Sequence, residues 1–312
     1  MQIKKATRES THLIISLTGP SGSGKTKSAL RLAEGLGEKI GFIDTESGRS
    51  GLYADEHNFD VLELESPFTP DRYIEALRKF EDAGYDVVII DSASHEWEGI
   101  GGVLDFADSQ KSSKGKPLQG LLKWKEPKSR HKKFVSELLR TRMHVIVCLR
   151  AKPVFEQRKG ADGRDEIVMV GYKEIAESSF IYEMTVSAML SNEAGRQGFP
   201  SMTKCPGALV SAFPSNAPIN ENTGREIAAW LGKIARDPEL ELLHRTAGDE
   251  AESGTEALQE FWGTLTKKQQ LKLKPSMEGF KAKAREADAQ PEDESVSNAN
   301  LEDPFNQSVA AD

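Results

Sequence analysis

The sequence HLIISLTGPSGSGKT at residues 12–26 decides the fold. Residues 12–18 form a short apolar run, which predicts a strand, and residues 25–36 carry apolar side chains at helical spacing. Between them, Gly19-Pro20-Ser21-Gly22-Ser23-Gly24-Lys25-Thr26 matches the pattern G-x-x-x-x-G-K-[ST]. Glycines allow the backbone N–H groups to point inward, and the N-terminus of the following helix adds positive potential. The stretch therefore predicts a strand, a loop and a helix that together bind a phosphate group.

The residue types of this loop also indicate chemical roles. A lysine at the position of Lys25 supplies a point charge for the β and γ phosphates of a nucleotide, and a hydroxyl at Thr26 is a ligand for Mg²⁺. We therefore expect the residues from Gly19 to Lys27 to bind ATP. A second element, DVVIID at residues 86–91, is an apolar strand that ends in an acid, which is the form of a Walker B strand. We expect Asp91 to hold Mg²⁺, usually through a water molecule.

Strands and helices alternate along the first 240 residues. Short apolar runs predict further strands, and the most apolar of them are typical of buried parallel strands. This alternation predicts an α/β fold with a mostly parallel sheet flanked by helices. The expected strands are 39–43, 61–64, 86–90, 144–149 and 180–190, and the expected helices are 71–83, 132–142 and 221–234.

The C-terminal part of the chain differs in composition. Residues 254–285 predict a small helical appendage, set off by the polar stretch 247–253 from a core of residues 1–240. Residues 286–312 contain eight acidic residues, no Lys or Arg, and few large apolar side chains. Such a segment buries too little surface to offset the entropy of ordering, so we expect a disordered acidic tail.

The charge balance at first argues against a nucleic-acid ligand, because 41 basic residues face 49 acidic ones and the net charge is -8. The tail accounts for the whole excess, since the other 285 residues hold 41 acidic and 41 basic residues. No apolar run approaches the roughly 18–20 residues of a membrane span, and the first residues lack the apolar core of a signal peptide. Cys148 and Cys205 are too few for a disulfide framework. We expect a cytoplasmic protein.

The stretch FIDTESGRSGLY at residues 42–53 indicates which branch of the P-loop proteins the chain is similar to. It places an acid, Glu46, just past the strand that follows the P-loop helix, and Tyr53 seven residues later. This pattern resembles the RecA-like recombinases. The resemblance implies a RecA-like P-loop ATPase fold in which Glu46 polarises the attacking water and Tyr53 stacks on adenine.

The later motifs extend the resemblance to residues 12–235. The Walker B strand of these recombinases also ends in Asp-Ser, as Asp91-Ser92 does here. The strand 144–149 is followed by Arg150 at the position of the family's γ-phosphate sensor, which is usually Gln. The order of the motifs matches the RecA core without its separate N-terminal oligomerisation segment, and the chain resembles the compact RecA-like ATPases of bacteriophages, including those that anneal single strands.

The resemblance implies further ligands and partners. It implies ATP and Mg²⁺ as cofactors, a location in the host cytoplasm, and an oligomer in which a base from a neighbouring copy completes the site. Arg196 and Lys204 are the candidates for that base. In the tail, Asp303-Pro304-Phe305 is similar to the acidic tip by which single-strand-binding proteins recruit partners, so such a protein or another recombination protein is a candidate partner.

Two intervals are candidates for contacts with DNA, because RecA-like recombinases present mobile loops after the corresponding strands. Residues 111–133 contain nine basic residues and one acid. Residues 151–167 contain four basic and four acidic residues with two glycines, and predict a flexible loop. A basic cluster can follow a phosphate backbone, and an aromatic ring can stack a base. The candidate contacts are Lys123, Trp124, Lys125, Lys128, Arg130, Lys132, Lys133, Arg158 and Lys159.

Together these features predict an Mg²⁺-dependent ATPase that acts on single-stranded DNA in phage-type recombination or annealing. Annealing, strand exchange and loading of another enzyme are all compatible with the motifs, as are a ring, a filament and an RNA ligand. One alternative is a nucleotide-gated scaffold or regulator that binds protein partners with little catalysis. Another is a P-loop kinase for a small metabolite, which Glu46 and the absence of an obvious arginine-rich lid disfavour.

Overall fold

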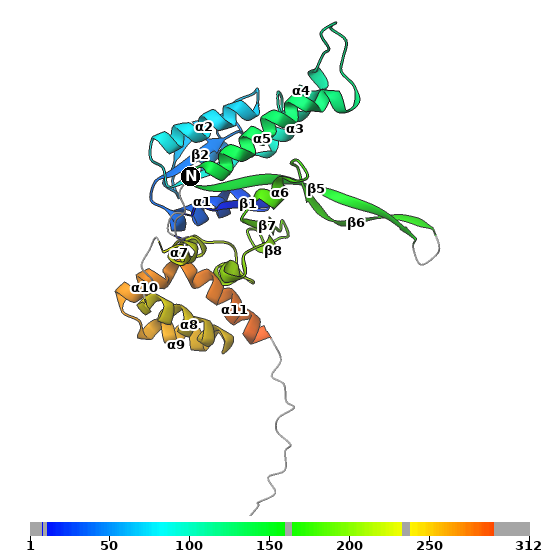
Figure 1. The fold of residues 1–312 in the computed structure, drawn as a ribbon. Coiled ribbons are helices and arrows are strands. Elements are labelled where there is room, and N and C mark those ends of the chain that lie inside the picture. Colours follow the sequence, from blue (N-terminus) through cyan, green and yellow to red (C-terminus); the bar gives the residue numbers. More distant parts are fainter. Residues whose placement is uncertain (1–7, 9–10, 160–163, 233–237, 290–312) are drawn as a thin grey trace, which may run out of the picture.

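The computed structural model describes residues 8, 11–159, 164–232 and 238–289. Its centre is a mostly parallel sheet with helices on both faces (Figure 1). The strand order is β3-β2-β4-β5-β1-β7-β8, and β6 pairs with β5. The β6 and β8 pairings are antiparallel and the others are parallel. The strands are β1 (Ile14–Gly19), β2 (Ile40–Asp44), β3 (Asp60–Glu63), β4 (Val87–Asp91), β5 (His144–Lys159), β6 (Asp165–Glu174), β7 (Val186–Leu190) and β8 (Pro200–Lys204).

The helices of this part of the chain cover the sheet or connect its strands. Helices α1 and α7 pack together on one face, whereas α2 and α5 pack together on the other (Figure 1). The predicted fold class, a mostly parallel sheet flanked by helices, is therefore confirmed. The elements are α1 (Lys25–Leu36), η1 (Arg49–Tyr53), α2 (Pro70–Asp82), α3 (Ser94–Glu98), α4 (Val103–Ser109), η2 (Gly120–Trp124), α5 (Lys125–Arg140), α6 (Phe180–Glu183), η3 (Gly207–Ala212) and α7 (Glu221–Trp230).

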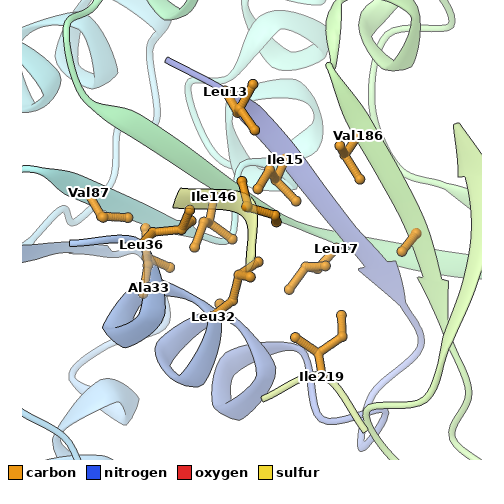
Figure 2. Close-up of a cluster of buried hydrophobic side chains, with 14 of the residues drawn as sticks. Leu13, Ile15, Leu17, Leu32, Ala33, Leu36, Val87, Ile146, Val186 and Ile219 are labelled. Atoms are coloured by element: carbon orange, nitrogen blue, oxygen red, sulfur yellow. The ribbon is translucent and has the colours of Figure 1, made fainter. Parts of the chain in front are cut away.

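Side chains of the central strands alternate between two apolar clusters, one on each face of the sheet. Ile15 and Leu17 of β1 pack with Leu32 of α1 (Figure 2). Ile14 points to the opposite cluster, which contains Phe134 of α5. Both faces are buried, so the central strands are almost entirely apolar, as expected for parallel strands between helix layers. This packing fixes the strand ends on which the candidate site is built.

The helices after residue 237 surround a separate apolar cluster that includes Leu243, Leu258 and Leu273. Its elements are α8 (Pro238–Glu252), α9 (Thr255–Thr264), α10 (Lys267–Leu273), η4 (Lys274–Ser276) and α11 (Met277–Ala289). The predicted appendage therefore begins too late, because the polar stretch 247–253 lies largely within α8. Ala247 and Ala251 form a buried face of α8. Because alanine side chains are small, this face does not stand out as apolar in the sequence. Helix α11 also includes the first four residues of the predicted tail, and the remaining 290–312 lie outside the described residues.

The predicted flexible loop 151–167 is wrong for most of its length. Strand β5 continues to Lys159 and pairs antiparallel with β6, so the two strands form a hairpin that projects from the body (Figure 1). Gly160 and Gly163 lie outside the described residues. Phe155, Ile167 and Met169 are exposed large apolar residues on this hairpin. Because both of its faces meet solvent, the strands lack the alternation that marks a half-buried strand.

Three other predicted bounds differ from the structure. Helix α5 begins at Lys125 rather than 132, because Pro127 is tolerated in a first helical turn. Residues 180–190 are not one strand, since α6 precedes the strand β7. Helix α7 ends at Trp230, and residues 233–234 of the predicted helix are not described. Among the described residues, no helix is long and apolar enough to cross a membrane.

Candidate nucleotide-binding site

The sheet places the predicted nucleotide-binding residues at the carboxyl ends of neighbouring strands. Gly19 at the end of β1 pairs in register with Arg150 of β5. Asp91 at the end of β4 pairs with Asp44 of β2 on one side and Cys148 of β5 on the other. The P-loop, the Walker B acid, the sensor position and the segment that carries Glu46 therefore meet at one edge of the sheet. Ligands of open α/β sheets bind at this edge.

The P-loop between β1 and α1 has a backbone that only glycine adopts without strain at two positions. Gly22 and Gly24 have φ angles of 75° and 79°. A Cβ atom on Gly24 would also lie 3.1 Å from the backbone nitrogen of Gly198. The Lys25 ammonium donates to the carbonyl oxygens of Gly19 and Pro20 at 2.9 Å each, which holds its charge at the loop. The loop, its lysine and the N-terminus of α1 thus form an anion-binding cradle.

The Thr26 hydroxyl donates a hydrogen bond of 2.6 Å to Oδ2 of Asp91. Burial raises the pKa of Asp91 to about 6; the Thr26 hydrogen bond and Lys25 oppose that shift, while the charges of Glu46 and Asp44 add to it. Mg²⁺ prefers hard oxygen ligands and is commonly held by one or two protein groups together with substrate phosphates. Among the described residues, no group of three or more His, Cys, Asp or Glu side chains could hold a metal alone. The Thr26–Asp91 pair fits Mg²⁺ that arrives with a nucleotide, and these two oxygens would hold it.

Replacing Asp91 by Asn should stabilise the protein in the absence of nucleotide. Because the folded pKa of about 6 lies above the ordinary value of 3.8, the ionised carboxylate costs folding free energy at pH 7. The folded state takes up a proton as the pH falls through 6, so that cost disappears on acidification. We expect Asp91→Asn to raise the free energy of unfolding at pH 7 by on the order of 1–3 kcal/mol, and we expect the gain to shrink towards pH 4.

Urea unfolding at pH 7, 5 and 4 measures this difference. Asp249→Asn, at an exposed position on α8, is the matched control and should change little. The same Asp91→Asn protein should lose the stabilisation that Mg²⁺ with ATP gives the wild type. An Asn variant that is less stable than the wild type at pH 7 would show that other interactions compensate the free-energy cost of the buried Asp91 charge.

The segment that carries Glu46 is held by Asp44, a residue that the sequence analysis did not single out. Asp44 is buried, its Oδ1 accepts from the backbone nitrogen of Glu46 at 2.7 Å, and its Oδ2 accepts from the backbone nitrogen and hydroxyl of Ser50 at 2.9 and 2.6 Å. The Glu46 carboxylate is partly exposed and lies 3.5 Å from Arg49. Asp44 therefore fixes the loop that presents Glu46 one strand away from Asp91.

A hydrogen-bond network, buried at Ser92 and exposed at Arg150, joins this loop to Arg150 through His95, which the sequence analysis also missed. The Thr45 hydroxyl accepts from the Ser92 backbone nitrogen at 2.7 Å and lies 2.8 Å from Nδ1 of His95. A guanidinium only donates, so Nε2 of His95 accepts from Arg150 at 3.4 Å and the ring proton sits on Nδ1. Burial and then the charge of Arg150 lower the pKa of His95, which keeps the ring neutral. Only its position four residues after Asp91 could have drawn attention to His95.

The remaining predicted nucleotide-site residues form contacts with other parts of the structure. Lys27 forms an exposed ion pair with Glu56 at 2.7 Å. Tyr53 ends η1, is half-buried against the core, and its ring centroid lies 6.5 Å from that of His57. Of the candidates for a base supplied in trans, the Arg196 guanidinium lies 5.0 Å from the Phe199 ring centroid, and Lys204 donates to the carbonyl of Tyr182 at 2.7 Å.

The predicted DNA-contact residues divide between two places in the structure. Arg158 and Lys159 lie near the end of the β5–β6 hairpin, in exposed ion pairs with Glu156 and Asp165. The others lie in η2 and α5, not in a mobile loop, and three of them are paired: Lys123 with Asp108, Lys128 with Glu177, and Arg130 with Glu126. Lys125, Lys132 and Lys133 are exposed and show no ion pair with any described residue.

The fold and the site together define a P-loop nucleotide-binding protein with a mostly parallel sheet flanked by helices. A family model described as an AAA domain (AAA_24) matches residues 11–186, which is more than half of the chain, so the chain belongs to this family of P-loop ATPases. No curated protein sequence matches it.

Several solved structures are similar to the chain, and two of them serve as examples. One is the RadB recombinase, with 18% identity and a TM-score of 0.32 over 57% of this chain and 73% of that chain. The other is a prototypical ATPase from the type III secretion system of pathogenic bacteria, with 12% identity and a TM-score of 0.38 over 88% of this chain and 84% of that chain.

Proposed function

We propose that the protein is an Mg²⁺-dependent ATPase that acts on single-stranded DNA in recombination or strand annealing of the phage type. The observation that carries the ATPase part is the 2.6 Å hydrogen bond between Thr26 and Asp91, which joins the end of the P-loop to the end of the Walker B strand. Few arrangements other than a metal–nucleotide site would place a buried carboxylate beside a P-loop hydroxyl. Magnesium, when bound there with ATP, neutralises charge on the phosphates.

Each protein group in this site has a distinct role in the proposal. Lys25 and the P-loop N–H groups bind the β and γ phosphates and stabilise the charge that develops on them during transfer. Glu46 orients and polarises the attacking water. Arg150, which is exposed beside His95, contacts the γ-phosphate from the sensor position. Most of the rate enhancement in such a reaction comes from positioning and electrostatics, so each role can be tested by one substitution.

The DNA part of the proposal is supported by the charge of one surface. The segment 111–133 combines nine basic residues with one acid, although residues 1–285 are neutral overall. In the structure, Lys125, Lys132 and Lys133 extend from the single helix α5 and are exposed. A row of ammonium groups without ion pairs to the described part of the chain can follow a phosphate backbone and release its counterions.

An oligomer is part of the same proposal. The β5–β6 hairpin carries large apolar side chains in solvent, with Ile167 78% exposed and Phe155 58% exposed. A two-stranded hairpin is at best marginally stable on its own, and an exposed apolar surface is typical of an interface. We infer that copies of the chain cover this hairpin when they assemble.

The test is ATP hydrolysis with and without single-stranded DNA, beside a DNA-binding assay repeated over a range of salt. We expect DNA to raise the turnover rate and the affinity to fall steeply with salt, because phosphate contacts dominate. Turnover that ignores DNA, together with no binding at low salt, would contradict the proposal and would favour a nucleotide-gated scaffold.

Charge reversal on α5 gives a sharper test of the DNA surface. We expect the double variant Lys125→Glu/Lys132→Glu to weaken binding to every single-stranded sequence and to reduce the salt slope by about one unit for each phosphate that is no longer bound. Lys267→Glu/Lys268→Glu, at exposed positions on α10, makes the same change in net charge and should leave binding almost unchanged. Equal weakening in the two variants would mean that only the total charge matters.

A further inference from the structure

A groove of about 770 Å³ lies between α3, the start of α5 and the connection from β6 to α6. Two tryptophans line it, Trp97 from α3 and Trp124 from the end of η2. Their ring planes are inclined by only 16° and their centroids are 6.4 Å apart. Both side chains are half-buried. The volume falls in the range of roughly 300–1,000 Å³ that is typical of small-molecule sites.

The groove is positively charged along one wall. Lys125, Lys128 and Lys132 line it from α5, and their spacing places all three on one face of the helix. One acid, Glu177, is among the lining residues. Burial alone would raise the pKa of Glu177, but hydrogen bonds from Ser179, including one of 2.6 Å from its backbone nitrogen, together with interactions with His131 and Lys128, outweigh burial and lower that pKa. Three lysines against one engaged glutamate leave the groove attractive to an anion.

A contact with the buried His131 ring holds Trp97 in place. Its ring packs against that of His131 at 5.7 Å between centroids, in an edge-on arrangement. His131 is buried and lies 3.0 Å from a carboxylate oxygen of Glu96, the residue before Trp97. The indole therefore presents its surface from a fixed position, which lowers the entropic cost of stacking a ligand on it.

Flat apolar surfaces beside a row of ammonium groups match a ligand that carries flat rings and phosphates. We propose that this groove binds unstacked bases of single-stranded nucleic acid, and that Trp97 and Trp124 make the protein selective for single strands over duplex. This inference rests on the proposed function, and it names the residues that make the protein prefer single strands to duplex. Base faces are free to stack in a single strand, whereas a duplex offers only base edges in its grooves.

Three ligands of equal length test the proposal by fluorescence anisotropy: an oligothymidine of about 20 nucleotides, an abasic strand with the same phosphates, and a duplex. Trp97→Ala and Trp124→Ala should each weaken oligothymidine binding by about 5- to 150-fold, the range for one stacked base. Binding of the abasic strand and of the duplex should stay at the wild-type value. Trp97→Phe and Trp124→Phe should restore most of the affinity, because a phenyl ring still stacks.

Tryptophan fluorescence gives a second measurement. The chain has four tryptophans, so Trp230→Phe/Trp262→Phe leaves only the two of the groove. Oligothymidine should quench this protein and the abasic strand should not. Equally weakened binding of all three ligands in the alanine variants would overturn the proposal. Fluorescence quenching by polyglutamate but not by oligothymidine would also overturn it, because that result would indicate a groove that binds protein. If the wild type binds oligothymidine and neither alanine variant changes that binding, the groove proposal alone is overturned. A wild type that binds none of the ligands would refute the DNA part of the proposed function.

Discussion

The Lys25→Ala protein is expected to lose nucleotide binding and to hydrolyse ATP at least about 10²–10³ times more slowly than the wild type. In the structure the Lys25 ammonium lies 2.9 Å from the carbonyl oxygens of Gly19 and Pro20. A phosphate oxygen is a stronger acceptor than either carbonyl, because hydrogen bonds between charged partners are about twice as strong as neutral ones. The lysine can therefore turn from the loop carbonyls to the phosphates when a nucleotide binds.

Two measurements separate this role from a structural one. The thermal midpoint of Lys25→Ala without nucleotide should match that of the wild type, while the rise in midpoint on adding Mg²⁺ and ATP should disappear. Lys79→Ala is the matched control, since Lys79 carries the same charge but forms an exposed ion pair with Glu75 on α2. If Lys79→Ala were as inactive as Lys25→Ala, the loss of one positive charge and not the position of Lys25 would explain the result.

The sequence predicts the sheet well because the relevant signals are local. The P-loop pattern, the apolar run of β4 and the helical spacing of α1 each lie within a dozen residues. The β5–β6 hairpin could not be predicted in the same way. Strands exposed on both faces show no alternation, and the charges of Glu156, Arg158 and Lys159 on one strand resemble those of a loop. The pairing of β5 with β6 becomes evident only in the folded structure, where the two strands lie side by side.

The candidate site likewise contains residues that local motifs predict and residues that they do not. Motifs indicate Lys25, Thr26 and Asp91, because their roles depend on spacing along the chain. The roles of His95 and Trp97 depend instead on residues far away in the sequence. His95 meets Thr45 and Arg150, which are 50 and 55 residues distant. No local pattern distinguishes such a histidine from one that merely packs in the core, so only the folded arrangement identifies it.

Glu46→Gln is expected to separate hydrolysis from binding. Glutamine keeps the size of the side chain and removes its capacity to accept a proton, so turnover should fall by about 10²–10⁴, the usual contribution of a general base. Binding of ATP with Mg²⁺ should be retained. The charge of Glu46 helps to raise the pKa of Asp91, so its removal should lower that pKa from about 6 and leave this carboxylate ionised to lower pH. The variant should therefore hold Mg²⁺ and ATP at pH 6 at least as well as the wild type.

Single-turnover hydrolysis and equilibrium nucleotide binding, both measured at pH 6 and pH 7.5, test this expectation. Glu65→Gln is the control, since Glu65 is an exposed acid that closely follows β3 at the same edge of the sheet. A Glu46→Gln protein that hydrolyses ATP normally would remove Glu46 from the proposed mechanism. Loss of binding together with hydrolysis would give Glu46 a role in shaping the site, because its backbone nitrogen already joins the Asp44 network that holds this loop. Only slow turnover with intact binding fits a residue that acts on the attacking water.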